Sequence, residues 1–145
     1  MTRVDFAFGA PDRLRTACDV VHKQYLRGRR LVVYSDDARL LTRFDRLLWG
    51  FKPTVFVPHV LADDALASAT PIVLCQQDPD PQLSQAGAEP AWLINLSDTC
   101  PPNSERFTRI LEIVSHDEND RELARTRWRQ YQSQGYQIHA HQLES

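Results

Sequence analysis

Residues 28–37 read Gly-Arg-Arg-Leu-Val-Val-Tyr-Ser-Asp-Asp, and this stretch predicts the fold class. Its central run, Leu31-Val32-Val33-Tyr34, is short, rich in β-branched residues and apolar throughout, as in a strand buried on both faces. Ser35-Asp36-Asp37 can then cap a helix. That helix carries apolar residues at helical spacing and ends near Trp49-Gly50: Leu40, Leu41, Phe44, Leu47 and Leu48. A fully buried strand followed by a helix is typical of a parallel sheet.

The same alternation extends to both sides of this stretch. Pro11 and Asp12 open a helix that Gly28 closes, and a last helix is predicted at 117–134, closed by Gly135. Strands are predicted at 4–8, 55–57, 71–74, 92–96 and 136–139, with a further apolar and partly β-branched stretch at 107–114. Residues 58–70 are a connection, and 76–90 form a polar loop. We therefore expect one α/β domain over 1–145, with a mostly parallel or mixed sheet flanked by helices.

Composition limits the class of function. The chain has 145 residues, 42% of them hydrophobic, which is sufficient for one buried core. Its formal net charge is -2, whereas a protein that mainly grips nucleic-acid phosphates is usually basic. Any basic surface must therefore be local.

Cysteine usage and hydropathy predict the compartment. The three cysteines are widely spaced and include no CxxC pair, which argues against a disulfide framework or a zinc ribbon. Cys18 and Cys75 lie among apolar residues and are predicted to pack as small core side chains. No signal peptide and no run of about 18 apolar residues is present. We expect a reduced, cytoplasmic protein that does not enter a membrane.

The motifs of common chemistries are missing. The glycine spacing allows neither GxGxxG nor GxxxxGK[ST], so the fold is Rossmann-like without a phosphate loop. There is no GxSxG motif, and Ser35 is better explained as a helix cap. His139 and His141 share a strand face, with His116 as a third candidate, but their spacing is a weak metal signal. Asp36-Asp37 and Asp63-Asp64 are predicted to be cap and loop residues. We therefore predict no catalytic residue, cofactor or metal.

The last helix carries a first candidate site. At about 100° per residue, Leu123, Ala124, Arg127 and Tyr131 gather on the side that should face the sheet. Another side combines guanidinium groups with an indole: Arg121, Arg125, Trp128, Arg129 and Gln132. One interpretation is a solvated basic face. The other is a pocket for an acidic peptide that also carries an aromatic residue.

The second candidate site comprises Trp49, at the end of a helix, and the segment Phe56-Val57-Pro58-His59. Tryptophan and phenylalanine are enriched at protein interfaces, so this group can form an aromatic patch for a partner protein. The alternative is ordinary core followed by a turn.

Several stretches resemble the chi subunit family of bacterial DNA polymerase III. They occur in the family's order along nearly the whole chain: Val4 to Phe8, Leu26 to Tyr34, Phe44 to Trp49, Phe56 to His59, Pro71 to Leu74, Leu93 to Leu96, Phe107 to Val114, and Leu123 to Tyr131 with Gly135.

The resemblance implies a fold like the nucleotide-binding half of a helicase without its phosphate loop, and no enzymatic activity. It implies two partners: the psi subunit, which connects chi to the clamp loader, and the acidic C-terminal tail of the single-stranded DNA-binding protein SSB. The SSB-tail residues carry over to Arg125, Trp128 and Arg129, and the psi-binding residues to Trp49, Phe56, Pro58 and His59. Trp128 stands where the family often has tyrosine or phenylalanine, and Arg129 where others have lysine.

Two other functions remain open from the sequence. The same arginines and Trp128 can bind single-stranded DNA directly, whereas the tethering function expects contact with DNA only through SSB. A degenerate nucleotide enzyme is the third possibility. The stretch between Val114 and the last helix varies among relatives, so no pocket residue is assigned there.

Overall fold

The computed structural model describes residues 2–51, 56–79 and 90–143. Its strands are β1 (Arg3–Ala10), β2 (Leu31–Tyr34), β3 (His59–Leu61), β4 (Ile72–Cys75), β5 (Trp92–Asn95), β6 (Arg109–Ser115) and β7 (Gln137–Gln142). The α-helices are α1 (Arg13–Leu26), α2 (Ala38–Gly50) and α3 (Glu118–Ser133), and short 3-10 turns cover Ala67–Ala69 and Ser104–Arg106.

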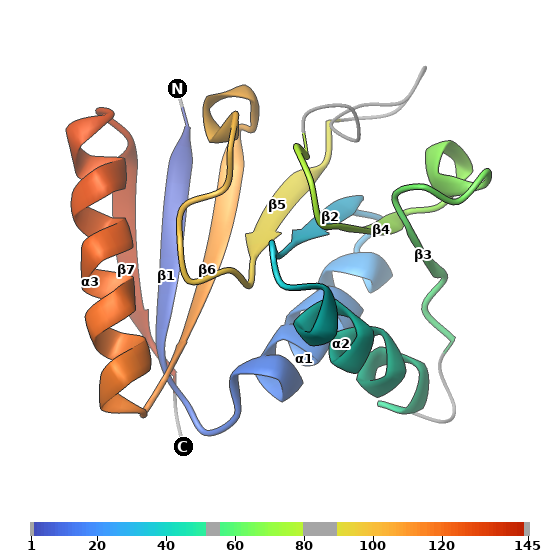
Figure 1. Ribbon diagram of the computed structural model, residues 1–145, viewed down its shortest axis with the longest axis horizontal. Helices are drawn as coiled ribbons and strands as arrows, with labels where there is room; N and C mark the ends of the chain where they lie inside the picture. Colours follow the sequence, from blue (N-terminus) through green and yellow to red (C-terminus); the bar gives the residue numbers. More distant parts are fainter. Residues whose placement is uncertain (1, 52–55, 80–89, 144–145) are drawn as a thin grey trace.

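The strands form one sheet in the order β3-β4-β2-β5-β6-β1-β7. All pairings in the described part of the chain are parallel, so the strands begin at one end of the sheet and finish at the other (Figure 1). The predicted α/β class is confirmed, and the sheet is parallel rather than mixed.

Two apolar cores lie on opposite faces of the sheet. On one face α1 and α2 pack against alternate strand residues, with Val21, Phe44 and Ile94 fully buried. On the other face α3 packs over β1 and β6, with Phe6, Ile110 and Tyr131 fully buried. Cys18 and Cys75 belong to these cores, as predicted. No helix in the described ranges has the length and apolar character to span a membrane.

Aspartates cap all three helices. Asp12 and Asp37 each accept hydrogen bonds from two backbone N–H groups in the first turn of their helix, and Asp117 accepts one from Asn119. The predicted cap at 35–37 is therefore Asp37, and the Ser35 hydroxyl accepts a hydrogen bond from its backbone N–H. Gly28 and Gly135 follow α1 and α3 with φ near +80°, a conformation that suits glycine at a helix end.

The predicted strand at 55–57 is wrong. Val55 lies outside the described residues, Phe56 to Pro58 form no strand, and β3 begins at His59. Pro58 has no N–H to donate, so pairing with β4 starts only after it. The predicted loop at 76–90 lies mostly outside the described residues, and 76–79 form no helix or strand.

Candidate protein-binding sites

The inward face of α3 is the one that the helical spacing predicts. Ala124, Arg127 and Tyr131 are buried, and Leu123 is half-buried. The outward face is therefore also as predicted, and it carries Arg125 and Arg129 as exposed residues.

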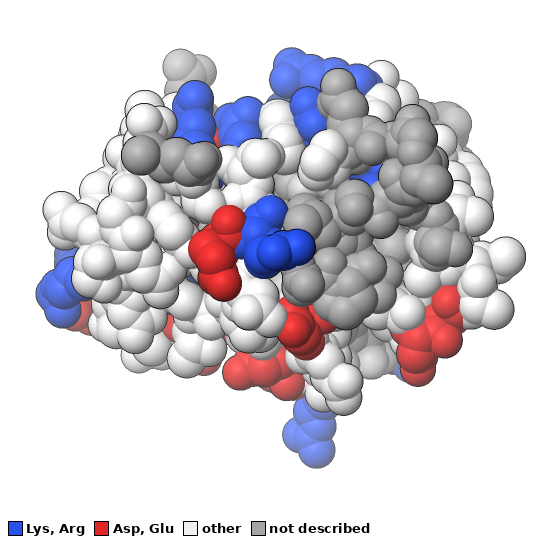
Figure 2. Space-filling model, turned by 90° about the horizontal axis from the view of Figure 1, so that it is seen from above, with Lys and Arg blue, Asp and Glu red and all other residues white. Residues whose placement is uncertain are grey.

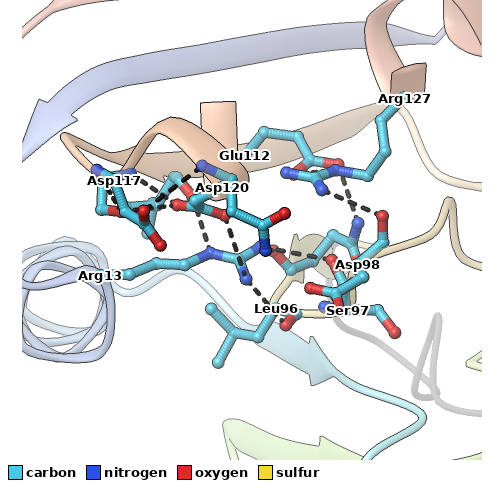
Figure 3. A network of polar contacts seen from close by, with 12 residues as sticks. Arg13, Leu96, Ser97, Asp98, Glu112, Asp117, Asp120 and Arg127 are labelled. Carbon is cyan, nitrogen blue, oxygen red and sulfur yellow. Dashed lines mark hydrogen bonds and ion pairs between the residues drawn. The ribbon is translucent and has the colours of Figure 1, made fainter. Parts of the chain in front are cut away.

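A buried ion pair fixes α3 against the sheet. Arg127 Nε lies 3.1 Å from Glu112 Oε1 on β6, and both side chains are fully buried. The Glu112 carboxylate also accepts hydrogen bonds from the Tyr131 hydroxyl at 2.7 Å and from Asn95 Nδ2 at 2.8 Å. Burial, reinforced by the Glu112 charge, raises the pKa of Tyr131 well above its ordinary value. Arg127 Nη1 also donates a hydrogen bond to the Asp98 carbonyl, 3.1 Å away (Figure 3).

A second arginine holds the N-terminal end of α3. Arg13, the first residue of α1, donates to the carbonyls of Ile113, Leu96 and Ser97 at the carboxyl ends of β6 and β5. Its Nη1 also lies 3.9 Å from Asp120 Oδ1 in the first turn of α3 (Figure 3). Helix α3 is therefore attached at its start and along its middle.

The outward face combines one aromatic ring with exposed charges. Trp128 is half-buried, with its ring centroid 5.0 Å from that of Phe6 and 6.3 Å from that of Phe8. Arg125 makes ion pairs with Glu122 and with Glu118, whose carboxylate lies 3.5 Å away. A carboxylate ligand of Arg125 must therefore displace these two acids, which sequence reasoning missed although they lie within two turns of the same helix.

A hollow of about 300 Å³ opens beside this face, where β1, β6 and β7 end. Its lining is Phe8, Gly9, Ser115, His116, Arg121 and Gln142. Phe8 joins the hollow to the Trp128 ring. Most of these residues come from strand ends far apart in sequence. Arg121 is the lining residue that lies on α3, so helix periodicity could predict the position of that residue alone.

The aromatic residues of the second candidate site also lie in contact with one another. Trp49 is 51% exposed and Phe56 is 62% exposed, and their ring centroids lie 5.1 Å apart. His59 is buried beneath this pair, with its ring centroid 4.3 Å from that of Trp49 and its Nε2 3.0 Å from Asp45 Oδ1. Pro58 is half-buried, whereas Val57 belongs to the core. The exposed part of the patch is therefore aromatic, and His59 supports it from below.

One cavity lies at the carboxyl ends of the strands, where α/β proteins often bind nucleotides. This cavity of about 400 Å³ lies beside the start of α2 and the ends of β3 and β4. Its described lining includes Asp63 and Asp78 and no basic residue, which suits phosphates poorly. In the described ranges no group of histidine, cysteine and acidic side chains could hold a metal ion. His141, one of the metal candidates, instead lies 2.8 Å from Asp5.

The fold and these surfaces define an open, parallel-sheet α/β protein with two exposed surfaces that combine aromatic rings and charged groups. Sequence comparison then gives the family, because residues 1–139 match the family model described as DNA polymerase III chi subunit, HolC. The chain belongs to this family, and its role lies in DNA replication.

Curated relatives agree with the family match. The chain is 31% identical to DNA polymerase III subunit chi of Pseudomonas aeruginosa, over 99% of this chain and 98% of the relative. It is 24% identical to DNA polymerase III subunit chi of Escherichia coli, over 83% of this chain and 79% of the relative. The protein of the same name from Haemophilus influenzae is 28% identical, over 84% and 81% of the two chains.

Proposed function

We propose that this chain is a non-catalytic accessory subunit that links the clamp loader, through psi, to the acidic C-terminal tail of SSB. The observation that carries the proposal is the outward face of α3. On this face the half-buried indole of Trp128 stands in the sequence between the exposed Arg125 and Arg129. One buried and one half-buried ion pair hold the helix in place.

In this function Arg125 and Arg129 bind the terminal carboxylate and the aspartates of the tail. Trp128, supported from below by Phe6 and Phe8, offers its remaining surface to the terminal phenylalanine ring. Because Arg125 exchanges Glu118 and Glu122 for ligand carboxylates, its net gain is small and is screened by salt. Many tails on DNA-coated SSB raise the effective concentration, so a modest affinity suffices.

Psi binding is assigned to the second patch. Trp49 and Phe56 present contiguous exposed aromatic surface, which is the composition of an interface centre. Pro58 borders this surface, and His59 holds the Trp49 ring from beneath. A Trp49→Ala, Phe56→Ala variant should therefore lose co-purification with psi while keeping its affinity for the SSB tail.

A peptide titration tests the tail site. An acidic peptide that ends in phenylalanine should change the tryptophan fluorescence, and Trp128→Phe should remove that change because Trp49 and Trp92 lie elsewhere. Arg125→Ala with Arg129→Ala should weaken binding by at least about tenfold, whereas Arg39→Ala with Arg43→Ala on α2 is the matched control. Unchanged affinity in the Arg125, Arg129 variant would refute the assignment.

Substituting the acids of α3 should change the affinity for the peptide in the opposite direction. Glu118→Gln with Glu122→Gln frees Arg125 from its intramolecular partners. Removal of two exposed competing charges should strengthen peptide binding by a few-fold, on the order of 1 kcal/mol. Weaker binding in this variant would show that Arg125 does not bind the ligand's carboxylates.

Each rival function makes a different prediction. Direct binding of single-stranded DNA by the same α3 residues requires oligonucleotide affinity that disappears in the Arg125→Ala, Arg129→Ala variant. A degenerate nucleotide enzyme requires a nucleotide in crystals soaked with one, at the carboxyl ends of the strands. The acidic lining of the cavity there argues against that outcome.

A further inference from the structure

Charge is distributed unevenly between the two ends of the sheet, although Arg13 and Arg121 lie at the carboxyl end among the aspartates. The parallel pairing places every strand's carboxyl end at the same end of the molecule. The connections that leave this end carry exposed aspartates: Asp12, Asp36, Asp37, Asp63, Asp64, Asp78, Asp98 and Asp117.

Arginines gather at the opposite end, where the strands begin. They either precede a strand or lie in its first residue: Arg3, Arg27, Arg29, Arg30, Arg106 and Arg109. Among the described residues, Asp5 and Glu105 are the acids that lie close to them in β1 and before β6. Figure 2 looks onto this end and shows groups of basic side chains along the upper edge and at the centre of the view, with acidic groups beside and below the central one.

Part of this surface is held in a fixed arrangement. The guanidinium carbons of Arg29 and Arg109 lie 4.1 Å and 4.3 Å from the centroid of the Trp92 ring. The two arginines reach the ring from opposite neighbours of β5, because Arg29 precedes β2 and Arg109 begins β6. Arg109 also pairs in register with Arg3, and both bind the buried Asp5 carboxylate. The arginines are thus positioned before any ligand arrives.

Helix dipoles account for part of this uneven distribution. The capping aspartates Asp12, Asp37 and Asp117 lie at helix N-termini, where negative charge is favourable. Arg27 lies at the C-terminal end of α1, where positive charge is favourable. Arg3 and Arg109 lie within strands instead, where they bind Asp5, so two cations share one carboxylate and leave net positive charge at this end.

We propose that this amino-terminal end of the sheet binds the phosphate backbone of single-stranded nucleic acid. Arginine donates in a fork that matches phosphate oxygens. Two guanidinium groups already pack on Trp92, so the proposed contact relies on phosphates, which carry no sequence information, rather than on base stacking at this ring. An acidic peptide with an aromatic end needs an apolar hollow, and both described hollows open at the other end.

The net negative charge of the chain does not prevent this contact. At about 3.3 Å per residue the two ends lie roughly 26 Å apart along the eight residues of β1 and roughly 13 Å apart along the four residues of β2, and both distances exceed the Debye length of about 8 Å at physiological salt. A polyanion at the basic end is therefore screened from the aspartates at the far end.

Charge reversal tests the proposal in the full chain. Binding of fluorescent 20-nucleotide dT and dA strands is followed by anisotropy over a range of salt concentrations. Arg27→Glu with Arg29→Glu should weaken binding at least about tenfold and flatten the salt dependence by about 1.4 log units per decade, which corresponds to two phosphate contacts. Arg27→Lys with Arg29→Lys should keep most of the affinity and confirms that the region folds.

Matched controls separate this surface from the other basic residues of the chain. Arg39→Glu with Arg43→Glu on α2 makes the same change in net charge and should leave binding within about twofold. Arg125→Ala with Arg129→Ala should also leave it unchanged, which keeps this proposal independent of the SSB-tail site. The proposal is overturned if the unaltered chain does not bind the oligonucleotides, or if the α2 variant loses as much affinity as the Arg27, Arg29 variant. It is also overturned if the α3 variant loses affinity, or if an acidic peptide binds this surface as tightly as the oligonucleotides do.

Discussion

Replacing Arg127 by methionine tests whether the buried ion pair holds α3 in place. The substitution removes a fully buried cation and leaves the Glu112 carboxylate with its two neutral donors, Tyr131 and Asn95. Breaking a buried pair by removing one partner typically destabilises a protein by about 3–5 kcal/mol. Arg127 Nη2 is buried without a hydrogen-bond partner among the described residues, and its removal relieves part of that loss. We therefore expect a loss near the lower limit, about 3 kcal/mol.

The assay is urea unfolding followed by far-UV circular dichroism. A loss of about 3 kcal/mol lowers the melting temperature of a domain of this size by roughly 10 °C. Arg129→Met is the matched control, because the same substitution two residues further on removes an exposed arginine and should change stability by less than about 0.5 kcal/mol.

A second substitution distinguishes an unpaired charge from simple loss of packing. Adding Glu112→Gln to Arg127→Met removes the uncompensated carboxylate while keeping an acceptor for Tyr131 and Asn95. The double variant should therefore be more stable than Arg127→Met alone, by about 1–2 kcal/mol. A loss below about 1 kcal/mol in Arg127→Met, or a further loss of stability in the double variant, would contradict a stabilising buried ion pair.

Three further predictions concern acid sensitivity, thiol reactivity and helix capping. Burial alone would raise the pKa of Asp5, but hydrogen bonds from Arg3, His141 and Arg109 outweigh it and lower the pKa from 3.8 to about 2. The folded pKa is thus below the unfolded one, so this carboxylate stabilises the fold by about 2 kcal/mol above pH 4, and the contribution disappears as pH falls from about 4 to 2. Asp5→Asn should remove that part of the pH dependence in unfolding curves. An unchanged profile would contradict the prediction. Burial raises the pKa of the Cys18 thiol to about 12 and that of the Cys100 thiol to about 11. Ellman's reagent at pH 8 should therefore react slowly with both thiols until urea is added. Fast reaction in the folded protein would contradict this prediction. Asp12→Ala should lower stability by about 1 kcal/mol because Leu14 and Arg15 lose the acceptor of their backbone N–H groups, and a neutral result in urea unfolding would show that water replaces the cap.

The sequence was sufficient for the fold where local pattern and burial agree. The apolar run of β2 and the helical spacing in α3 depend on neighbours within a turn or a few strand residues, so both could be predicted directly. The strand at 55–57 failed because Pro58 cannot donate to a ladder, and the pairing therefore starts at His59.

The candidate sites were predictable only where their residues lie close together in the sequence. Arg125, Trp128 and Arg129 share one helix, so spacing alone placed them together. The partner of Arg127 lies on β6, and the hollow beside Trp128 is built from strand ends brought together by the sheet. An isolated glutamate in the apolar run Ile110-Leu111-Glu112-Ile113-Val114 is the signal that could have indicated a buried ion pair.

The two attachments of α3 also bear on the thermodynamics of docking. Asp120 joins the helix to Arg13, and Arg127 joins its middle to Glu112, so the backbone beneath the outward face already has a settled conformation. A ligand that lands there orders mainly its own chain and a few long side chains. The entropy lost on association should therefore come chiefly from the incoming peptide, and stiffening that peptide should improve affinity more than any further rigidity in this protein.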